Sequence, residues 1–341
     1  MTDAKPTSLR DIAERVGVSV MTVQRAIGAP HLVAEKTRRR ILQVMREAGY
    51  VPDRNAASLV SRSSGFVGLV VRSTASPSFA AEVDGVAQFT RATGRDLLLA
   101  CAGHDADGEH DALRAMLGRR PAGIVLTFSP ADDATRTLLG QADVPVVETW
   151  DDPADPIDMV AGFSNDEAAR QVARYLARTG RRRPAYFGAS TGPGQARWTG
   201  FAEEWARATD QQAVHVPLDA IGSGSIGPGG EDGFASGAAL FDQLGELDQA
   251  VDCVFCASDA IAAGVVFEAQ RRGVAVPDDL AVCGFGDMAI AASMIPALTT
   301  VSVPARDMGL RAGELIAARH AGRPGPRRAL LSTRLIVRDS A

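Results

Sequence analysis

The sequence has little cysteine, few aromatic residues and no long apolar run. Four cysteines in 341 residues are too few for a disulfide framework. No apolar run approaches the roughly 18–20 residues that a membrane-spanning helix needs, and residues 1–11 lack the apolar core of a secretory signal. Only 5% of the residues are aromatic, but 46% are hydrophobic, which excludes wholesale disorder. These features predict a folded cytoplasmic protein that contacts no membrane.

Motifs that would indicate catalysis or metal binding are weak. Cys253 and Cys256 form a CxxC pair, but they lie in the apolar run 251–257, which is typical of a buried strand, where positions i and i+3 face opposite sides. The loop 222–227 matches GxGxxG, but it opens no first βαβ unit, and a further Gly/Pro run follows it. The five histidines are dispersed. We therefore predict no metal site, no cofactor and no enzymatic activity.

Charge is distributed unevenly along the chain. Residues 1–62 hold 11 Lys and Arg against 6 Asp and Glu, a net of +5, whereas residues 63–341 hold 25 against 35, a net of −10. A small basic segment joined to a large acidic one indicates that only the N-terminal part approaches a polyanion. The alternative is an ordinary fluctuation of surface charge along the chain.

The chain beyond residue 65 alternates short apolar runs with helical patterns. This alternation is typical of βαβ units in parallel sheets that helices cover on both faces. Ten strands exceed one usual sheet, so two α/β lobes are predicted. The predicted strands are 66–71, 96–101, 123–128, 145–148, 159–162, 185–188, 214–216, 253–257, 280–285 and 299–303. The predicted helices include 80–92, 166–179, 197–208, 237–247, 260–272 and 306–318.

Residues 7–50 have the pattern of a helix-turn-helix. Ala13 permits close approach of two helices, Gly17 permits a turn with positive φ, and Val23 packs the second helix on the first. Ser19 is placed to cap the second helix, 20–27. A third helix is predicted at 35–48, and Ile12, Val16 and Ile27 are expected to form the core. The alternative is a small helical domain whose basic face is merely solvated.

Several longer motifs, in collinear order, resemble the LacI-type family of bacterial transcription regulators. The motifs that carry the resemblance are Ser8–Ala13, Gly17–Ser19, Thr22–Arg25, Gly49–Pro52, Arg197–Phe201, Ser258–Ala260, Pro277–Leu280, Gly284–Asp287 and Pro296–Val301. Three further segments, 146–148, 162–170 and 267–270, look most like the gluconate-repressor branch. The resemblance spans nearly the whole chain.

The resemblance implies a fold class and a domain plan. A helix-turn-helix DNA-binding headpiece would occupy residues 1–53, and a hinge helix 54–64, a polar segment that suits a linker. A two-lobed, periplasmic-binding-protein-like α/β core with parallel sheets would occupy 65–341. Lobe one would comprise about 65–163 plus 293–325, and lobe two about 164–292 plus 326–341. The family plan further implies a homodimer on a near-palindromic double-stranded operator.

Residues that contact DNA are predicted from the second helix and the start of the third. The resemblance places Val20, Met21 and Arg25 on the family's base-reading positions and Leu59 on the hinge leucine that wedges into the minor groove. Gln24 replaces the usual Ser, Ala34 stands where a Ser or Thr cap is usual, and Asp53 replaces an Asn. The complete predicted DNA set is Ser19, Val20, Met21, Thr22, Gln24, Arg25, Thr37, Arg38 and Leu59.

Ligand-binding residues are predicted at the carboxyl ends of the core strands. Arg197 matches the family's main ligand-binding arginine, and a planar bidentate donor suits vicinal hydroxyls or a carboxylate. Arg72 ends the first strand, and Gly286 stands where the family usually has Asp, so both changes favour an anionic ligand. The complete predicted set is Arg72, Phe79, Glu148, Arg197, Ser258 and Asp259.

The function predicted from these features is ligand-responsive transcriptional regulation. We expect a repressor of sugar-acid catabolism genes that a small effector, a sugar acid or sugar, releases from DNA. The alternatives are a regulator that senses a neutral sugar or nucleoside, and a DNA-binding protein whose core serves only dimerisation. No heptad extension follows the last apolar run, so a dimer is the expected assembly.

Overall fold

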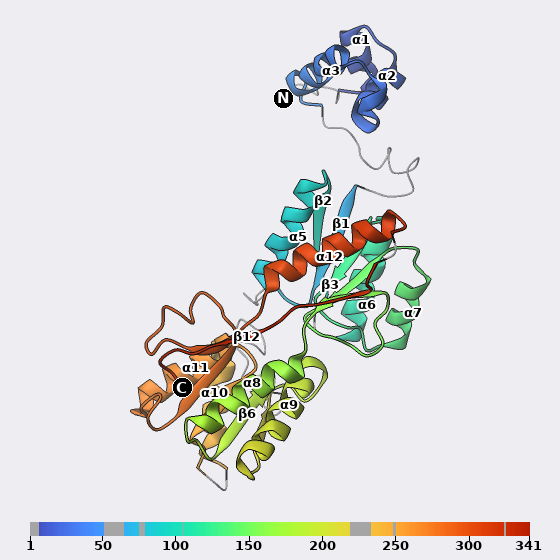
Figure 1. The fold of residues 1–341 in the computed structure, drawn as a ribbon. Coiled ribbons are helices and arrows are strands. Elements are labelled where there is room, and N and C mark those ends of the chain that lie inside the picture. The colour runs from blue at the N-terminus through green and yellow to red at the C-terminus, as the bar shows by residue number, and fades with distance from the viewer. Residues whose placement is uncertain are drawn as a thin grey trace. The chain divides into compact units, whose positions relative to one another are not determined.

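The computed structural model describes residues 7–50, 65–74, 79–103, 105–218, 233–247, 250–323 and 325–341. The chain divides into two compact units, Met1–Gly65 and Phe66–Ala341 (Figure 1). Leu59, Asp53, the predicted hinge helix and the GxGxxG loop lie outside the described residues. None of the helices within the described ranges has the length and apolarity to cross a membrane.

The N-terminal unit is the predicted three-helix arrangement. It comprises α1 (Leu9–Val16), α2 (Val20–Gly28), a 3-10 turn (Pro30–Leu32) and α3 (Glu35–Glu47). Ser8 caps α1 through a reciprocal capping box with Asp11, and Gly17 ends that helix at φ 76°. Ile12 and Val16 are buried as predicted, whereas Ile27 is only partly buried. The remaining buried core residues are Ala13, Val23, Ala26, Ile41 and Met45.

The described residues of the second unit form two six-stranded sheets. In the first, which belongs to lobe one, the strand order is β11-β5-β4-β3-β1-β2 and all pairs are parallel. In the second, which belongs to lobe two, the order is β12-β10-β9-β8-β6-β7, and only β12 is antiparallel to its neighbour. The strands are β1 (Phe66–Val71), β2 (Asp96–Cys101), β3 (Gly123–Leu126), β4 (Val146–Thr149), β5 (Met159–Gly162), β6 (Pro184–Gly188), β7 (Val214–Pro217), β8 (Cys253–Cys256), β9 (Ala281–Gly286), β10 (Thr299–Ser302), β11 (Arg328–Leu330) and β12 (Arg334–Ile336).

Helices cover both faces of each sheet, as the continuous apolar strands predict. One face of the first sheet packs on α5 and α12, which lie side by side in Figure 1, and the other face packs on α6 and α7. In lobe two, α8 and α9 cover one face and α10 and α11 the other. The helices are α5 (Ala80–Ala92), α6 (Ala106–Leu117), α7 (Asp133–Gln141), α8 (Asn165–Arg178), α9 (Gly192–Thr209), α10 (Phe234–Leu244), α11 (Asp259–Arg272) and α12 (Ala305–His320).

After residue 290, the lobe to which each segment was predicted to belong differs from the sheet in which the structure places it. β10 pairs with β9 in the second sheet, and β11 pairs with β5 in the first. The chain therefore passes between the lobes at 162–165, 302–305 and 330–334, rather than near 293 and 325. β11 and β12 are absent from the predicted strands, because both are short and only partly buried and so lack a clear apolar pattern.

Two local predictions can be compared directly with the fold. Cys253 packs in the core under α8 and α9, and Cys256 packs in the core under α10 and α11, so the two thiols do face opposite sides of the sheet. Burial raises the pKa of both thiols. Helix α9 begins at Gly192, five residues before the predicted start, because Pro193 suits the first turn of a helix.

Candidate functional sites

Helix α2 presents a mixed apolar and polar row to solvent. The Ser19 hydroxyl accepts a hydrogen bond from the Thr22 backbone N–H at 3.1 Å, which begins the helix at Val20. Val20 is 37% exposed and Met21 58% exposed, and Gln24 and Arg25 are exposed beside them. Exposed apolar groups next to amide and guanidinium donors suit thymine methyl groups and base edges in a major groove.

The start of α3 is less basic than its sequence indicates. The Glu35 carboxylate accepts from Arg39 Nε at 2.9 Å and lies 3.7 Å from Arg38 Nη1. The hydrogen bond from Arg39 lowers the pKa of Glu35. Thr37 is half-buried, and Ala34 offers no side-chain cap, as predicted. Arg38 and Arg39 can therefore bind a phosphate either while they keep their contacts with Glu35 or after they give them up.

The helix caps of this unit provide a matched pair of variants. Ser19→Ala is expected to destabilise α2 by about 1 kcal/mol, because the Thr22 N–H loses its acceptor. Ala34→Ser is expected to stabilise α3 by a similar amount. Amide hydrogen exchange of the full-length variants measures both effects. If exchange in α2 were unchanged in Ser19→Ala, this account of the cap would be wrong.

In lobe one, Arg72 is neither a solvated edge residue nor a free cation. Its Nε donates to Glu109 Oε1 at 2.8 Å, and its guanidinium carbon lies 4.8 Å from the centroid of the Phe128 ring. Glu109, on α6, is buried. Part of the positive charge that the sequence assigns to this edge of the sheet is therefore balanced inside lobe one.

Two carboxylates of the predicted ligand set are structural in this conformation. Glu148 is fully buried, accepts the Ile157 N–H at 2.7 Å and has a pKa raised by burial. Asp259 is fully buried and accepts from the Met288 N–H at 2.6 Å and from the Thr300 hydroxyl. Burial raises the pKa of Asp259 to about 6. Ser258 caps α11 by accepting the Ile261 N–H at 3.3 Å.

Arg197 is held by lobe two at three points. Its Nε donates to the Pro193 carbonyl at 3.2 Å, and its Nη1 donates to the Ala257 carbonyl at 2.8 Å. Its guanidinium carbon lies 4.4 Å from the centroid of the Phe285 ring. Because Ala257 and Phe285 lie at the carboxyl ends of β8 and β9, the guanidinium is fixed where open α/β sheets bind ligands.

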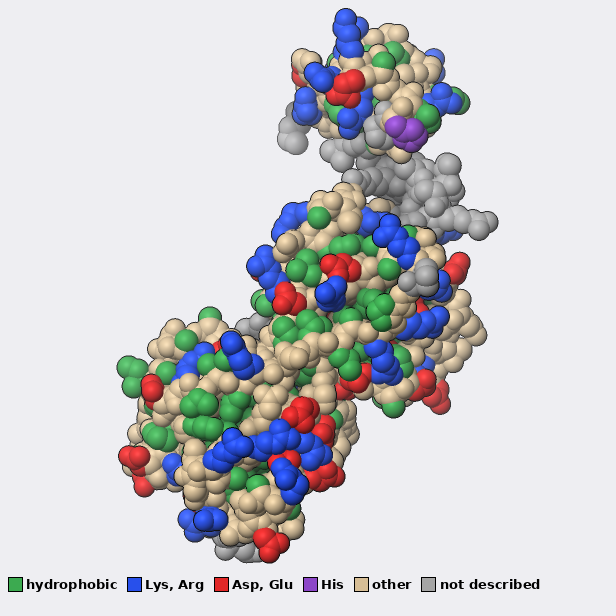
Figure 2. Space-filling model, viewed as in Figure 1, with side chains coloured by type: hydrophobic (Ala, Val, Ile, Leu, Met, Phe, Trp, Pro, Cys, Tyr) green, Lys and Arg blue, Asp and Glu red, His purple; other side chains and the backbone are tan. Residues whose placement is uncertain are grey.

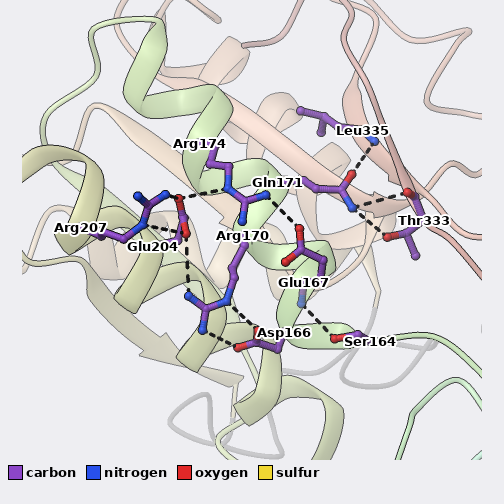
Figure 3. Close-up of polar contacts among 10 residues, drawn as sticks. All are labelled: Ser164, Asp166, Glu167, Arg170, Gln171, Arg174, Glu204, Arg207, Thr333 and Leu335. Atoms are coloured by element: carbon purple, nitrogen blue, oxygen red, sulfur yellow. Dashed lines mark hydrogen bonds and ion pairs between the residues drawn. The ribbon is translucent and has the colours of Figure 1, made fainter.

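An interhelical charge network supports the helix that carries Arg197. Glu204, on α9, is nearly buried and accepts from Arg174 Nε at 3.0 Å and from Arg207 (Figure 3). Arg170, also on α8, pairs with Asp166 at 2.6 Å. Gln171 links this network to the segment 330–334, which connects the lobes, by donating to the Thr333 hydroxyl at 3.1 Å. Figure 2 shows the charges of both signs interleaved over α8 and α9.

An aromatic row joins the two lobes. Phe79, at the start of α5, meets Trp150, which follows β4, with ring centroids 5.2 Å apart. Trp150 meets Phe163 at 6.2 Å, and Phe163 meets Phe285 of lobe two at 5.9 Å. The row thus runs from the predicted residue Phe79 to the ring under Arg197. Trp150 is not among the predicted ligand residues, because the sequence marks it only by its position directly after a strand.

The sequence was predicted to contain no GxSxG motif, but Gly188–Gly192, between β6 and α9, matches it. In hydrolases this strand-turn-helix setting presents a nucleophilic serine to a histidine. Here His215 Nε2 contacts the Gly188 carbonyl at 2.9 Å, and its ring stacks on Trp198 at 5.0 Å. The observed geometry gives this turn the role of starting α9 ahead of Arg197. Among the described residues, no three His, Cys, Asp or Glu side chains gather as metal ligands would.

Residues 8–53 match the bacterial regulatory proteins of the lacI family, and residues 173–341 match the periplasmic binding protein-like domain. The HTH-type transcriptional regulator GntR of Escherichia coli is 32% identical over 314 residues, which cover 92% of this chain and 92% of that protein. This chain belongs to the lacI family. The lacI-family regulator IdnR of Escherichia coli is 30% identical and covers 91% of this chain and 90% of its own length.

A solved structure agrees with the lacI-family assignment. A transcriptional regulator of this family from Silicibacter pomeroyi is 26% identical, superimposes with a TM-score of 0.84, and covers 98% of this chain and 99% of that one. The predicted class, a DNA-binding transcriptional regulator with a helix-turn-helix and a two-lobed core, is thereby confirmed. The similarity to GntR and IdnR also agrees with the predicted branch of the family.

Proposed function

We propose that this lacI-family regulator represses genes of sugar-acid catabolism and that an effector bound between its lobes releases it from its operator. The observation that carries the proposal is the fixed guanidinium of Arg197 at the carboxyl ends of β8 and β9. A ligand that binds one arrangement of the lobes better than the other shifts the equilibrium by its differential affinity. The protein would act in the cytoplasm and without catalysis.

The DNA-reading residues are proposed on α2 and at the start of α3. Exposure supports Val20, Met21, Gln24 and Arg25 as base contacts, and the partly exposed Thr22 lies between them. Ser19, Thr37 and Arg38 are proposed to contact phosphates, with Arg38 exchanging its contact with Glu35. Leu59 is proposed as the minor-groove wedge on the resemblance alone.

A homodimer is the proposed assembly. Helix-turn-helix regulators bind two half-sites about one helical turn apart, which a two-fold symmetric dimer matches. Sedimentation equilibrium of the full chain tests the assembly. A monomer at the concentration where DNA is bound would contradict it.

The effector is proposed to be a sugar acid. Arg197 offers a planar donor to a carboxylate, and Phe79 with Trp150 offers apolar faces to the carbon skeleton. The Arg72–Glu109 ion pair favours the alternative, a neutral sugar or nucleoside, because it balances one of the two cations on which the anionic assignment rests.

Calorimetry with D-gluconate, with its neutral open-chain counterpart D-glucitol and with the cyclic sugar D-glucose decides between these classes. We expect tighter binding of the acid. Tighter binding of the neutral sugar would overturn the sugar-acid assignment. An absence of binding across a metabolite library would favour a core that only dimerises.

A further inference from the structure

A buried carboxyl group lies behind the aromatic row of lobe one. Glu82, in the first turn of α5, is fully buried. Its Oε2 accepts a hydrogen bond from Trp150 Nε1. Trp150 is half-buried and has φ 65°, in the left-handed region that bulky residues rarely adopt. Asn165 lies at the end of the segment 162–165, which connects the lobes. Its side chain donates to the Trp150 carbonyl at 2.9 Å and so supports this backbone conformation.

The second oxygen of Glu82 indicates which protonation state the site accommodates. Among the described residues, Oε1 has no hydrogen-bond partner. The Thr149 hydroxyl, which lies beside Glu82, donates its proton to the Leu126 carbonyl at 2.9 Å and so has none to give Oε1. A carboxylate at this position would therefore leave a buried, charged oxygen without a donor among the described residues. A neutral carboxylic acid accepts from Trp150 and buries no charge.

None of the described residues around Glu82 supplies a compensating charge. β4 and its end present Thr149 and Trp150. From α12, Gly309 packs against the backbone of Glu82, and Arg306 directs its guanidinium to Gln88 at 2.9 Å. Burial, only partly offset by the polar side chains of Thr149 and Trp150, raises the pKa of Glu82 to about 7. An unpaired buried carboxylate is costly, so the neutral form is favoured below that pH.

We propose that Glu82 is a positioning residue, a neutral carboxylic acid that holds the Trp150 indole as the lobe-one wall of the effector cleft. A displaced indole would change the position of Arg197 through three successive contacts. Trp150 contacts Phe163, Phe163 contacts Phe285, and the Arg197 guanidinium lies over the Phe285 ring. Ionisation of Glu82 would place an uncompensated charge in the buried site beside the indole, which loosens the indole and weakens effector binding. This inference rests on the proposed effector function.

Two substitutions of Glu82 separate positioning from packing. Glu82→Gln keeps an acceptor for Trp150 and carries no charge, so it imitates the neutral acid without titrating. Glu82→Leu keeps the volume but removes the hydrogen bond from Trp150. Asp84→Asn, at an exposed carboxylate on the same helix, is the matched control.

The readouts are D-gluconate affinity by calorimetry at pH 6 and pH 8, and Trp150 emission, obtained as the difference between each protein and its Trp150→Phe counterpart. We expect at least tenfold weaker binding in Glu82→Leu at both pH values. The wild type and Asp84→Asn are expected to bind several-fold more weakly at pH 8 than at pH 6, and Glu82→Gln equally at both. The buried Asp259 and Glu148 are present in every variant, so the comparison isolates Glu82.

Trp150 emission keeps the test independent of the effector. In the wild type it is expected to titrate near pH 7, and in Glu82→Gln to stay constant. If the wild type binds no sugar acid, the proposed effector fails while this titration still tests Glu82. Equal titration in wild type and Glu82→Gln would overturn the inference, and so would wild-type effector affinity in Glu82→Leu.

Discussion

Arg197→Ala is expected to weaken effector binding by about 2–5 kcal/mol, roughly thirtyfold to several thousandfold. The guanidinium is fixed by the Pro193 and Ala257 carbonyls and by the Phe285 ring, so little side-chain entropy is lost when it binds a ligand. Removing it leaves the ligand carboxylate desolvated without its planar partner. Calorimetry with D-gluconate measures the loss, and operator affinity without effector is expected to stay unchanged.

Two further variants keep this prediction specific. Arg207→Ala removes an equal charge from the same helix, but its side chain is 69% exposed and contacts Glu204, so effector affinity is expected to change little. Arg197→Lys is expected to give an intermediate loss, because a lysine lacks the planar fork. Equal losses in Arg197→Ala and Arg207→Ala would show that only net charge matters and would contradict a direct contact.

Arg25→Ala is expected to weaken operator binding by about 1–3 kcal/mol, roughly five- to 150-fold. Arg25 is exposed on α2 beside Gln24 and Met21, so its guanidinium is free to reach a base edge in the major groove. The loss is expected to be confined to operators that carry the preferred base at one position of each half-site. Anisotropy titrations with a set of single-base operator variants measure this dependence.

The control for Arg25 is another exposed arginine of the same unit. Arg10 pairs with Glu14 at 3.3 Å on α1, outside the proposed reading helix. Arg10→Ala is expected to lower affinity weakly and equally for all operator variants, through the salt-dependent term alone. If Arg25→Ala also weakened all operators equally, Arg25 would contact phosphate and the base-reading assignment would fail.

The headpiece was predictable from the sequence because its determinants are local. Ser8 and Asp11 form a capping box three residues apart, Gly17 ends α1, and Ser19 begins α2. The α/β alternation of the core was equally visible, since buried parallel strands are continuously apolar. β11 and β12 were missed because edge strands of three residues carry no such pattern.

The candidate cleft was only partly predictable, because its determinants lie far apart in the chain. Arg197 was predicted from the family resemblance, but its contacts with Ala257 and Phe285 lie at the ends of two other strands. Glu148 and Asp259 were predicted as ligand contacts; in the structure both are buried, Glu148 Oε2 accepts from the Ile157 N–H, and the two oxygens of Asp259 accept from Met288 and Thr300. Glu82 and Trp150 are 68 positions apart in the chain, and nothing in the sequence around either residue indicates that the two form a hydrogen bond.

The most direct test of the account is the effect of the effector on operator affinity. A labelled operator, selected from random DNA with the full chain, is titrated with wild type and with Arg197→Ala in the presence and absence of saturating D-gluconate. The account predicts at least tenfold weaker operator binding by the wild type when D-gluconate is present, and no change for Arg197→Ala. Unchanged operator affinity of a wild type whose cleft is saturated, as calorimetry verifies, would contradict it.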